Sequence, residues 1–151
     1  MSLNEEVELL RNIPLFSKIE PSKLKLLAFT SERLTFHKDQ DLCVEGEMGD
    51  AAFIIIDGGA DVIVSTPNGP LKVTEVAKND FVGEISILRD VPRTATVTAS
   101  SDCTVLRISK DLFFRLVSEF PEMAVEIMRE LARRLENTTI QLREATTAAS
   151  N

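Results

Sequence analysis

The stretch that decides how this chain folds runs from Phe81 to Val97 and reads FVGEISILRDVPRTATV. Segments of alternating apolar and polar residues, typical of β-strands, lie on both sides of it. Residues 83–88 break that pattern and indicate a single helical turn that begins at Gly83. The first N–H groups of a helix have no partner inside it, and glycine lets a ligand approach the backbone closely. The stretch therefore predicts an anion-binding turn within a β-structure.

Two charged residues of this stretch, Glu84 and Arg93, extend the hypothesis of an anion site. The net charge of the chain is −7, and an acidic protein that binds an anion needs a dedicated cation, which an arginine supplies in bidentate form. A carboxylate beside an anion is useful when the ligand also carries a hydroxyl donor, as a ribose does. The combination suits a sugar phosphate, although an exposed glutamate and arginine that flank a turn would leave the same pattern.

The residues around this stretch, from 31 to 108, predict an all-β barrel or sandwich. Short alternating segments recur there between turn signals, as in a sheet of short strands. These segments are 34–36, 42–44, 53–56, 60–64, 71–76, 95–99 and 104–108. Asn68-Gly69 stands between two of them and predicts a hairpin turn.

Helical patterns flank the β-region on both sides. In the N-terminal segment, 1–30, residues 3–12 and 22–29 predict two short helices, the first of them ended by Pro14. We expect one domain that is mainly β with flanking helices.

The C-terminal segment, 109–144, predicts two further helices. Ser109 is a good N-cap for the first, and Pro121 interrupts the pattern before a longer helix from Glu122 to about Glu144. Residues 145–151 lack periodicity and are expected to form a flexible tail.

Composition excludes several classes of function. No cluster of Lys and Arg stands out, so we do not expect this chain alone to bind nucleic acid. With one histidine, His37, and two cysteines, Cys43 and Cys103, the chain offers neither a histidine triad nor the usual spacing of metal ligands. No apolar run approaches the ~20 residues of a membrane span, and no secretory signal opens the sequence. We expect a cytoplasmic domain with no membrane or metal partner.

The stretch from 81 to 97 resembles the phosphate-binding cassette of the cyclic-nucleotide-binding domain family. The pattern of that family is Phe-Gly-Glu, then Leu or Ile, a small residue and Leu, followed later by Pro-Arg, a small residue, Ala, Thr and Val. Glu84 precedes Arg93 by nine residues, as in the regulatory subunits of cAMP-dependent kinase.

The resemblance extends over nearly the whole chain. Other residues at family positions are Leu15-Phe16, Glu45-Gly46, Gly58, Asp102-Cys103 and Pro121. The departures are Val82, where Phe is usual, and Asn79 and Gln40, at or near positions where glycine is common. None of the departures falls on a ligand-binding position of the family.

The resemblance implies a β-roll, a jelly-roll-like double-stranded β-helix, with N-terminal helices, a short phosphate-binding helix and a long C-terminal helix. It also implies cAMP as the ligand, with cGMP as the other candidate. Glu84 should bind the ribose 2′-hydroxyl and Arg93 an exocyclic phosphate oxygen. The remaining cassette residues implied to surround the cyclic phosphate are Gly83, Ile85, Ser86 and Ala95. Thr94 can hydrogen-bond guanine in cGMP-preferring members, but a hydroxyl there also serves cAMP binders.

A second match lies on the last helix. Residues 132–135, ARRL, with Thr138-Thr139 after them, resemble the catabolite-activator branch of the family, in which a Thr-Ser pair contacts the adenine amino group. Thr138 and Thr139 could read adenine in the same way, although two threonines on a solvated helix face would look alike.

The last helix also carries a stripe with 3–4 spacing, which either forms a homodimer seam or covers the β-roll of its own chain. Its members are Met128, Leu131, Leu135, Thr138 and Leu142.

These features predict a regulatory or sensor domain that binds cAMP and relays the event through its C-terminal helix. No general base or metal set is placed for hydrolysis, so we expect no catalytic residues and no enzyme. The alternative is the ligand-binding portion of a catabolite-activator-type transcription regulator, whose helix-turn-helix is absent from this chain.

Overall fold

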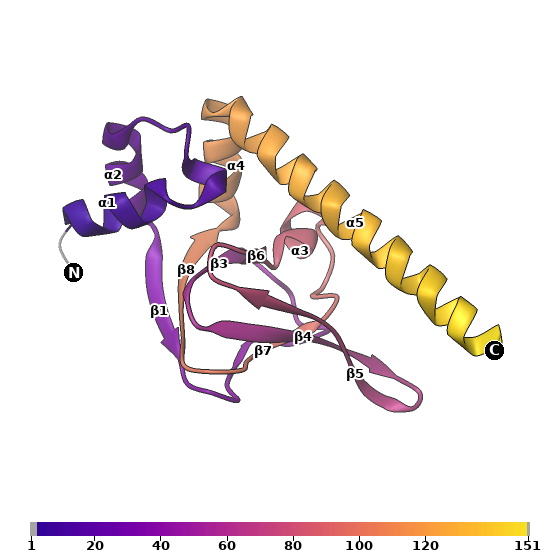
Figure 1. Ribbon diagram of the computed structural model, residues 1–151. Coiled ribbons are helices and arrows are strands. Elements are labelled where there is room, and N and C mark those ends of the chain that lie inside the picture. The colour runs from indigo at the N-terminus through magenta and orange to yellow at the C-terminus, as the bar shows by residue number, and fades with distance from the viewer. Residues whose placement is uncertain (1–2, 151) are drawn as a thin grey trace.

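Two four-stranded antiparallel sheets form the centre of the protein (Figure 1). The computed structural model describes residues 3–150 and the side chains of residues 3–148. The first sheet has the order β1 (Glu32–Phe36), β8 (Cys103–Ser109), β3 (Ala51–Asp57) and β6 (Phe81–Val82). The second has the order β2 (Asp41–Cys43), β7 (Thr96–Ala99), β4 (Gly59–Thr66) and β5 (Gly69–Ala77). The predicted β-roll with flanking helices is confirmed.

Strand β3 separates two hydrophobic cores, which explains its unbroken apolar run. Phe53 and Ile55 pack between the two sheets, in the cluster that also holds Val97 and Val105. Successive side chains of a strand point to opposite faces, so the alternate residues enter a second cluster beneath the helices. Both faces of β3 are therefore buried, and the first sheet is the shared wall of the two cores.

The helices pack on the outer face of the first sheet and contribute to that second cluster. They are α1 (Leu3–Arg11), η1 (Pro14–Phe16), α2 (Pro21–Thr30), α4 (Lys110–Glu119) and α5 (Pro121–Ser150). The predicted N-cap of α4 is confirmed, because the Ser109 hydroxyl accepts a hydrogen bond from the Leu112 amide at 3.2 Å. Among the described residues, no helix combines the length and hydropathy needed to cross a lipid bilayer.

The predicted helix end at Glu144 is wrong, because α5 continues to Ser150. No glycine or proline stands between Glu122 and Ser150, and alanine-rich segments without breakers favour helix even where no apolar periodicity marks them. Residue 151 of the predicted tail lies outside the described residues. In Figure 1, α5 runs past the short helix α3 (Glu84–Arg89) and continues on the side of the β4–β5 hairpin.

Two departures from the family pattern have a local explanation. Asn79 and Asp39, the neighbour of Gln40, adopt φ angles of 77° and 75°. These angles lie in the left-handed region that glycine prefers, and Asn and Asp are the other residues that visit it readily. The turns of the β-roll are thus kept without the glycines that are common there. The β4–β5 hairpin is also present, with Thr66 paired to Gly69.

Candidate functional site

A cavity of about 1050 Å³ opens between strand β5, the segment around α3, and helix α5. Eight of the nine residues predicted for the site line it: Gly83, Glu84, Ile85, Ser86, Arg93, Thr94, Ala95 and Thr138. Thr139 does not line the cavity. One residue advances an α-helix by about 100°, so neighbouring residues of α5 face different directions. The structure thus brings together the cassette and one of the two threonines.

Gly83 forms the turn that leads into α3. Its φ of 86° lies in the left-handed region, and it occupies the N-cap position of the helix. A Cβ atom at this position would stand 2.6 Å from Arg93 Nη1 and 3.2 Å from the Ala51 carbonyl oxygen. Both the backbone conformation and the closeness of Arg93 therefore require glycine.

The Arg93 side chain lies beneath this turn and is only 7% exposed. Nη1 donates to the Gly83 carbonyl at 3.0 Å and to Ser86 Oγ at 2.9 Å, and Nη2 donates to the Ala51 carbonyl at 2.8 Å. These bonds use three of the five N–H donors of a guanidinium. Every acceptor is neutral, and Arg93 pairs with no carboxylate in the part of the chain that the structure describes. The buried cation faces the cavity with donors to spare.

Glu84 is the buried anion of the site and is 3% exposed. Its Oε1 accepts from Arg134 Nη1 of α5 at 3.0 Å. Burial raises the pKa of the Glu84 carboxyl, and the nearby Arg134 guanidinium opposes that rise. Glu84 therefore joins the cassette to the last helix through an ion pair.

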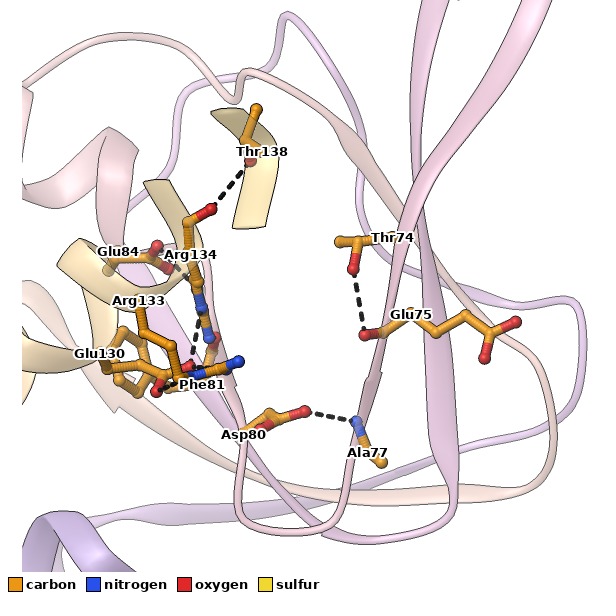
Figure 2. A network of polar contacts seen from close by, with 10 residues as sticks. All are labelled: Thr74, Glu75, Ala77, Asp80, Phe81, Glu84, Glu130, Arg133, Arg134 and Thr138. Carbon is orange, nitrogen blue, oxygen red and sulfur yellow. Dashed lines mark hydrogen bonds and ion pairs between the residues drawn. The ribbon is translucent and has the colours of Figure 1, made fainter. Parts of the chain in front are cut away.

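Arg134 is the central residue of the polar network in Figure 2. Besides Glu84, it donates to the Phe81 carbonyl and to Glu130 Oε1, the latter at 3.2 Å, and its guanidinium lies 4.5 Å from the centre of the Phe81 ring. The sequence motif 132–135 includes Arg134, but nothing in the sequence predicted that Arg134 belongs to the site. The partner of Arg134 lies 50 residues away along the chain, so no local spacing could have revealed the contact.

Strand β5 and helix α5 also contribute apolar side chains to the lining of the cavity. Leu71 and Val73 of β5 line one side, and Leu135 and Leu142 of α5 line the other. All four side chains are 40–68% exposed. Of the stripe predicted as a homodimer seam, Leu131, Leu135, Thr138 and Leu142 line the cavity and Met128 does not. Four of the five residues of the stripe therefore border the cavity of their own chain.

The two cysteines and the histidine lie in different surroundings. Cys43 lines the cavity, Cys103 is buried between the sheets, and His37 is exposed beside Asp102. Within residues 3–148, no three side chains of His, Cys, Asp or Glu are grouped so as to hold a metal ion.

Comparisons with known proteins agree with this geometry. The family model described as "Cyclic nucleotide-binding domain" matches residues 33–120. The chain is 29% identical over 136 residues to a CRP-like cAMP-activated global transcriptional regulator of Mycobacterium tuberculosis, a match that covers 89% of this chain and 61% of that protein. It is 33% identical over 125 residues to a cyclic nucleotide-gated potassium channel of Mesorhizobium japonicum, covering 83% of this chain and 33% of that one.

Among solved structures, the Thermus thermophilus catabolite activator protein has the same fold. Its TM-score is 0.77 over 88% of this chain and 63% of that one, at 22% identity. The chain spans less than two thirds of the length of each of the two curated relatives. The family model covers more than half of the chain, including the whole stretch from Phe81 to Val97. The chain therefore belongs to the family of cyclic nucleotide-binding domains.

Proposed function

We propose that this cavity binds cAMP, and that Arg93 binds the cyclic phosphate. The observation that supports this most is the burial of the Arg93 guanidinium with neutral acceptors only. A buried charge without a counter-charge is costly, so such a group is normally matched by an ion of opposite sign. A phosphodiester supplies one negative charge and two exocyclic oxygens that suit the planar fork of arginine.

Glu84 is proposed to accept a hydrogen bond from the ribose 2′-hydroxyl. An ionised carboxylate has about four acceptor sites, so Glu84 can hold Arg134 and the ribose at the same time. The amides and side chains around Gly83, Ile85, Ser86, Thr94 and Ala95 complete the proposed phosphate site. No step of this scheme breaks a bond, and we propose that the site binds its ligand without transforming it.

Thr138 favours adenine over guanine in this proposal. Its hydroxyl donates to the Arg134 carbonyl of the preceding helical turn at 2.9 Å. The hydroxyl proton is thereby committed, and the oxygen is left as an acceptor. The 6-amino group of adenine is a donor and suits this oxygen, whereas the 6-oxo group of guanine would face it acceptor to acceptor. The hydroxyl of Thr94 keeps cGMP as the alternative ligand.

Helix α5 is proposed to relay the binding event, since Arg134 joins it to Glu84 in the cassette. A ligand that contacts both Glu84 and α5 binds one position of the helix more tightly than another. This difference in affinity shifts the equilibrium between the two positions of the helix. A homodimer through α5 is part of this proposal, because Met128, Leu135 and Leu142 recur every seven residues and are 60–68% exposed.

A second candidate is the ligand-binding portion of a cAMP-activated transcription regulator. It is favoured by the match of 89% of this chain to 61% of the mycobacterial regulator. In that case a DNA-binding segment other than residues 1–151 would respond to ligand binding, and the nucleotide site proposed above is unchanged.

Calorimetry with cAMP, cGMP and 2′-deoxy-cAMP tests the ligand and the role of Glu84 together. We expect the wild type to bind cAMP most tightly. Glu84→Gln should weaken cAMP by about tenfold, the size of a lost charge-assisted hydrogen bond, and leave 2′-deoxy-cAMP nearly unchanged. Glu126→Gln, on a part of α5 outside the cavity, is the matched control. Absence of binding to every cyclic nucleotide would refute the proposed function.

A further inference from the structure

The loop between β2 and β3, residues 44–50, lies against the main chain of Arg93. The Gly46 amide donates to the Arg93 carbonyl at 2.9 Å, and the Arg93 amide donates to the Glu47 carbonyl at 2.8 Å. Strand β3 begins directly after the loop at Ala51, whose carbonyl accepts from the Arg93 side chain. One continuous segment thus holds both the backbone and the guanidinium of Arg93.

Gly49 of this loop lies against the Arg93 guanidinium itself. A Cβ atom at Gly49 would stand 2.5 Å from Arg93 Cζ, 2.5 Å from Arg93 Nε and 2.5 Å from Ser86 Oγ. Non-bonded carbon atoms rest about 3.5–4.0 Å apart. A methyl group at Gly49 would therefore fit only if the guanidinium moved away by about 1 Å.

The backbone of Gly49 does not itself require glycine. Its φ lies outside the left-handed region, whereas Gly46 of the same loop has a φ of 89°. The three atoms nearest to the Cβ position of Gly49 all belong to side chains and none to the backbone. Alanine is therefore compatible with the fold at this position. What it would disturb is the placement of the Arg93 and Ser86 side chains.

The Arg93 guanidinium has little room to move aside. Its hydrogen bonds to Ser86 Oγ and to two backbone carbonyls fix its orientation. A Cβ atom at Gly83 would stand 2.6 Å from Nη1, so a second glycine, from another part of the chain, confines the same group. Gly49 does not line the cavity. Any effect of Gly49 on a ligand must therefore pass through the side chains that it contacts.

We propose that Gly49 is a positioning residue of the phosphate site, because the missing side chain leaves the space in which the Arg93 guanidinium lies. This inference rests on the proposed function, since it concerns the same anion. A bidentate contact between guanidinium and phosphate depends on the alignment of two parallel N–H···O bonds. Such bonds weaken steeply when the donor is displaced or turned. A shift of about 1 Å would therefore weaken phosphate binding while the positive charge is kept.

Calorimetry with cAMP tests this role on wild type, Gly49→Ala and the control Gly69→Ala, which adds the same methyl group where nothing lies within 4 Å. We expect Gly49→Ala to weaken cAMP by about tenfold, the size of one charge-assisted hydrogen bond, and Gly69→Ala by less than about twofold. The same substitution is then made in Arg93→Lys. Lysine has no planar fork to misalign, so Gly49→Ala should there weaken cAMP by less than about twofold.

Three outcomes overturn this inference alone. The first is a cAMP affinity of Gly49→Ala equal to that of wild type. The second is an equal loss in the wild-type and Arg93→Lys backgrounds, which would mean that Gly49 acts independently of the guanidinium. The third is a Gly49→Ala protein that does not fold by circular dichroism, since the close contacts would then belong to the fold. If wild type binds no cyclic nucleotide, the proposed function fails and this inference fails with it.

Discussion

Replacing Arg134 with methionine removes the cationic partner of a buried carboxylate while keeping an unbranched apolar side chain at the same place. Breaking a fully buried ion pair on one side costs about 3–5 kcal/mol. The Arg134 side chain is 28% exposed while that of Glu84 is 5% exposed, so water screens part of the interaction. We therefore expect Arg134→Met to lower the free energy of unfolding by about 2–3 kcal/mol at neutral pH.

This loss should depend on pH in a defined direction. Burial raises the pKa of Glu84 above its ordinary 4.5, and Arg134 opposes that rise. Without Arg134 the folded-state pKa rises further. A carboxyl whose pKa is higher in the folded than in the unfolded state destabilises the fold when it ionises, so the penalty is absent below the unfolded value and complete above the folded value. The difference in unfolding free energy between variant and wild type should be small near pH 4 and should grow as the pH rises toward 7.

Urea unfolding at both pH values provides the assay, with Glu84→Gln and the double variant completing a mutant cycle. In the Glu84→Gln background, Arg134→Met should cost only about 0.5–1 kcal/mol, from its contacts with Phe81. Arg129→Met is the matched control, because the Arg129–Glu126 pair is at the surface with Arg129 70% exposed. Equal losses at the two pH values, or strict additivity in the cycle, would refute the interpretation of Arg134 as the electrostatic partner of Glu84.

Three further predictions concern the turn, the base and the seam. Gly83→Ala should lower the free energy of unfolding by about 1–3 kcal/mol and also weaken the binding of cAMP. Gly69→Ala, at φ 105° with open space around the Cβ position, should lower the free energy of unfolding alone. Urea unfolding and calorimetry separate the two effects, and equal cAMP affinity in both variants would contradict the contact with Arg93. Thr138→Val should weaken the binding of cAMP by several-fold in calorimetry, whereas Thr139→Val should not, because only Thr138 of the two lines the cavity. Equal effects of the two substitutions would contradict this orientation of α5. Met128→Glu should abolish a homodimer in sedimentation, because Met128 lies on the predicted seam and outside the cavity and an unpaired carboxylate is costly to bury there; a wild type that stays monomeric with and without cAMP contradicts the seam.

The part of the site that could be predicted from sequence is the part carried by a contiguous segment. Gly83, Glu84 and Arg93 lie within one stretch, and the glycine, carboxylate and guanidinium each have a chemical reason to be there. Strand β6 was missed because two residues are too few to show alternation. The sequence does not predict the end of α5, because residues 145–148 are exposed and the segment shows no apolar period.

The contribution of α5 to the site depends on how the helix packs, which the local pattern does not contain. The contact of Arg134 with Glu84 joins residues 50 positions apart. The motif match placed Thr138 and Thr139 together, but only the packing of α5 against the cassette decides which of them faces the cavity. The seam stripe has the same ambiguity, since its spacing suits either a second copy or the protein's own β-roll.

The central claim is that the buried Arg93 guanidinium binds the cyclic phosphate, and the affinity of Arg93→Lys for cAMP tests it most directly. Lysine keeps the positive charge but loses the planar fork. Arg129→Lys, at an exposed position, is the control. We expect Arg93→Lys to remain folded by circular dichroism and to bind cAMP about 10- to 100-fold more weakly than wild type, while Arg129→Lys binds normally. Equal cAMP affinity in folded Arg93→Lys and wild type would contradict the assignment of the phosphate to Arg93.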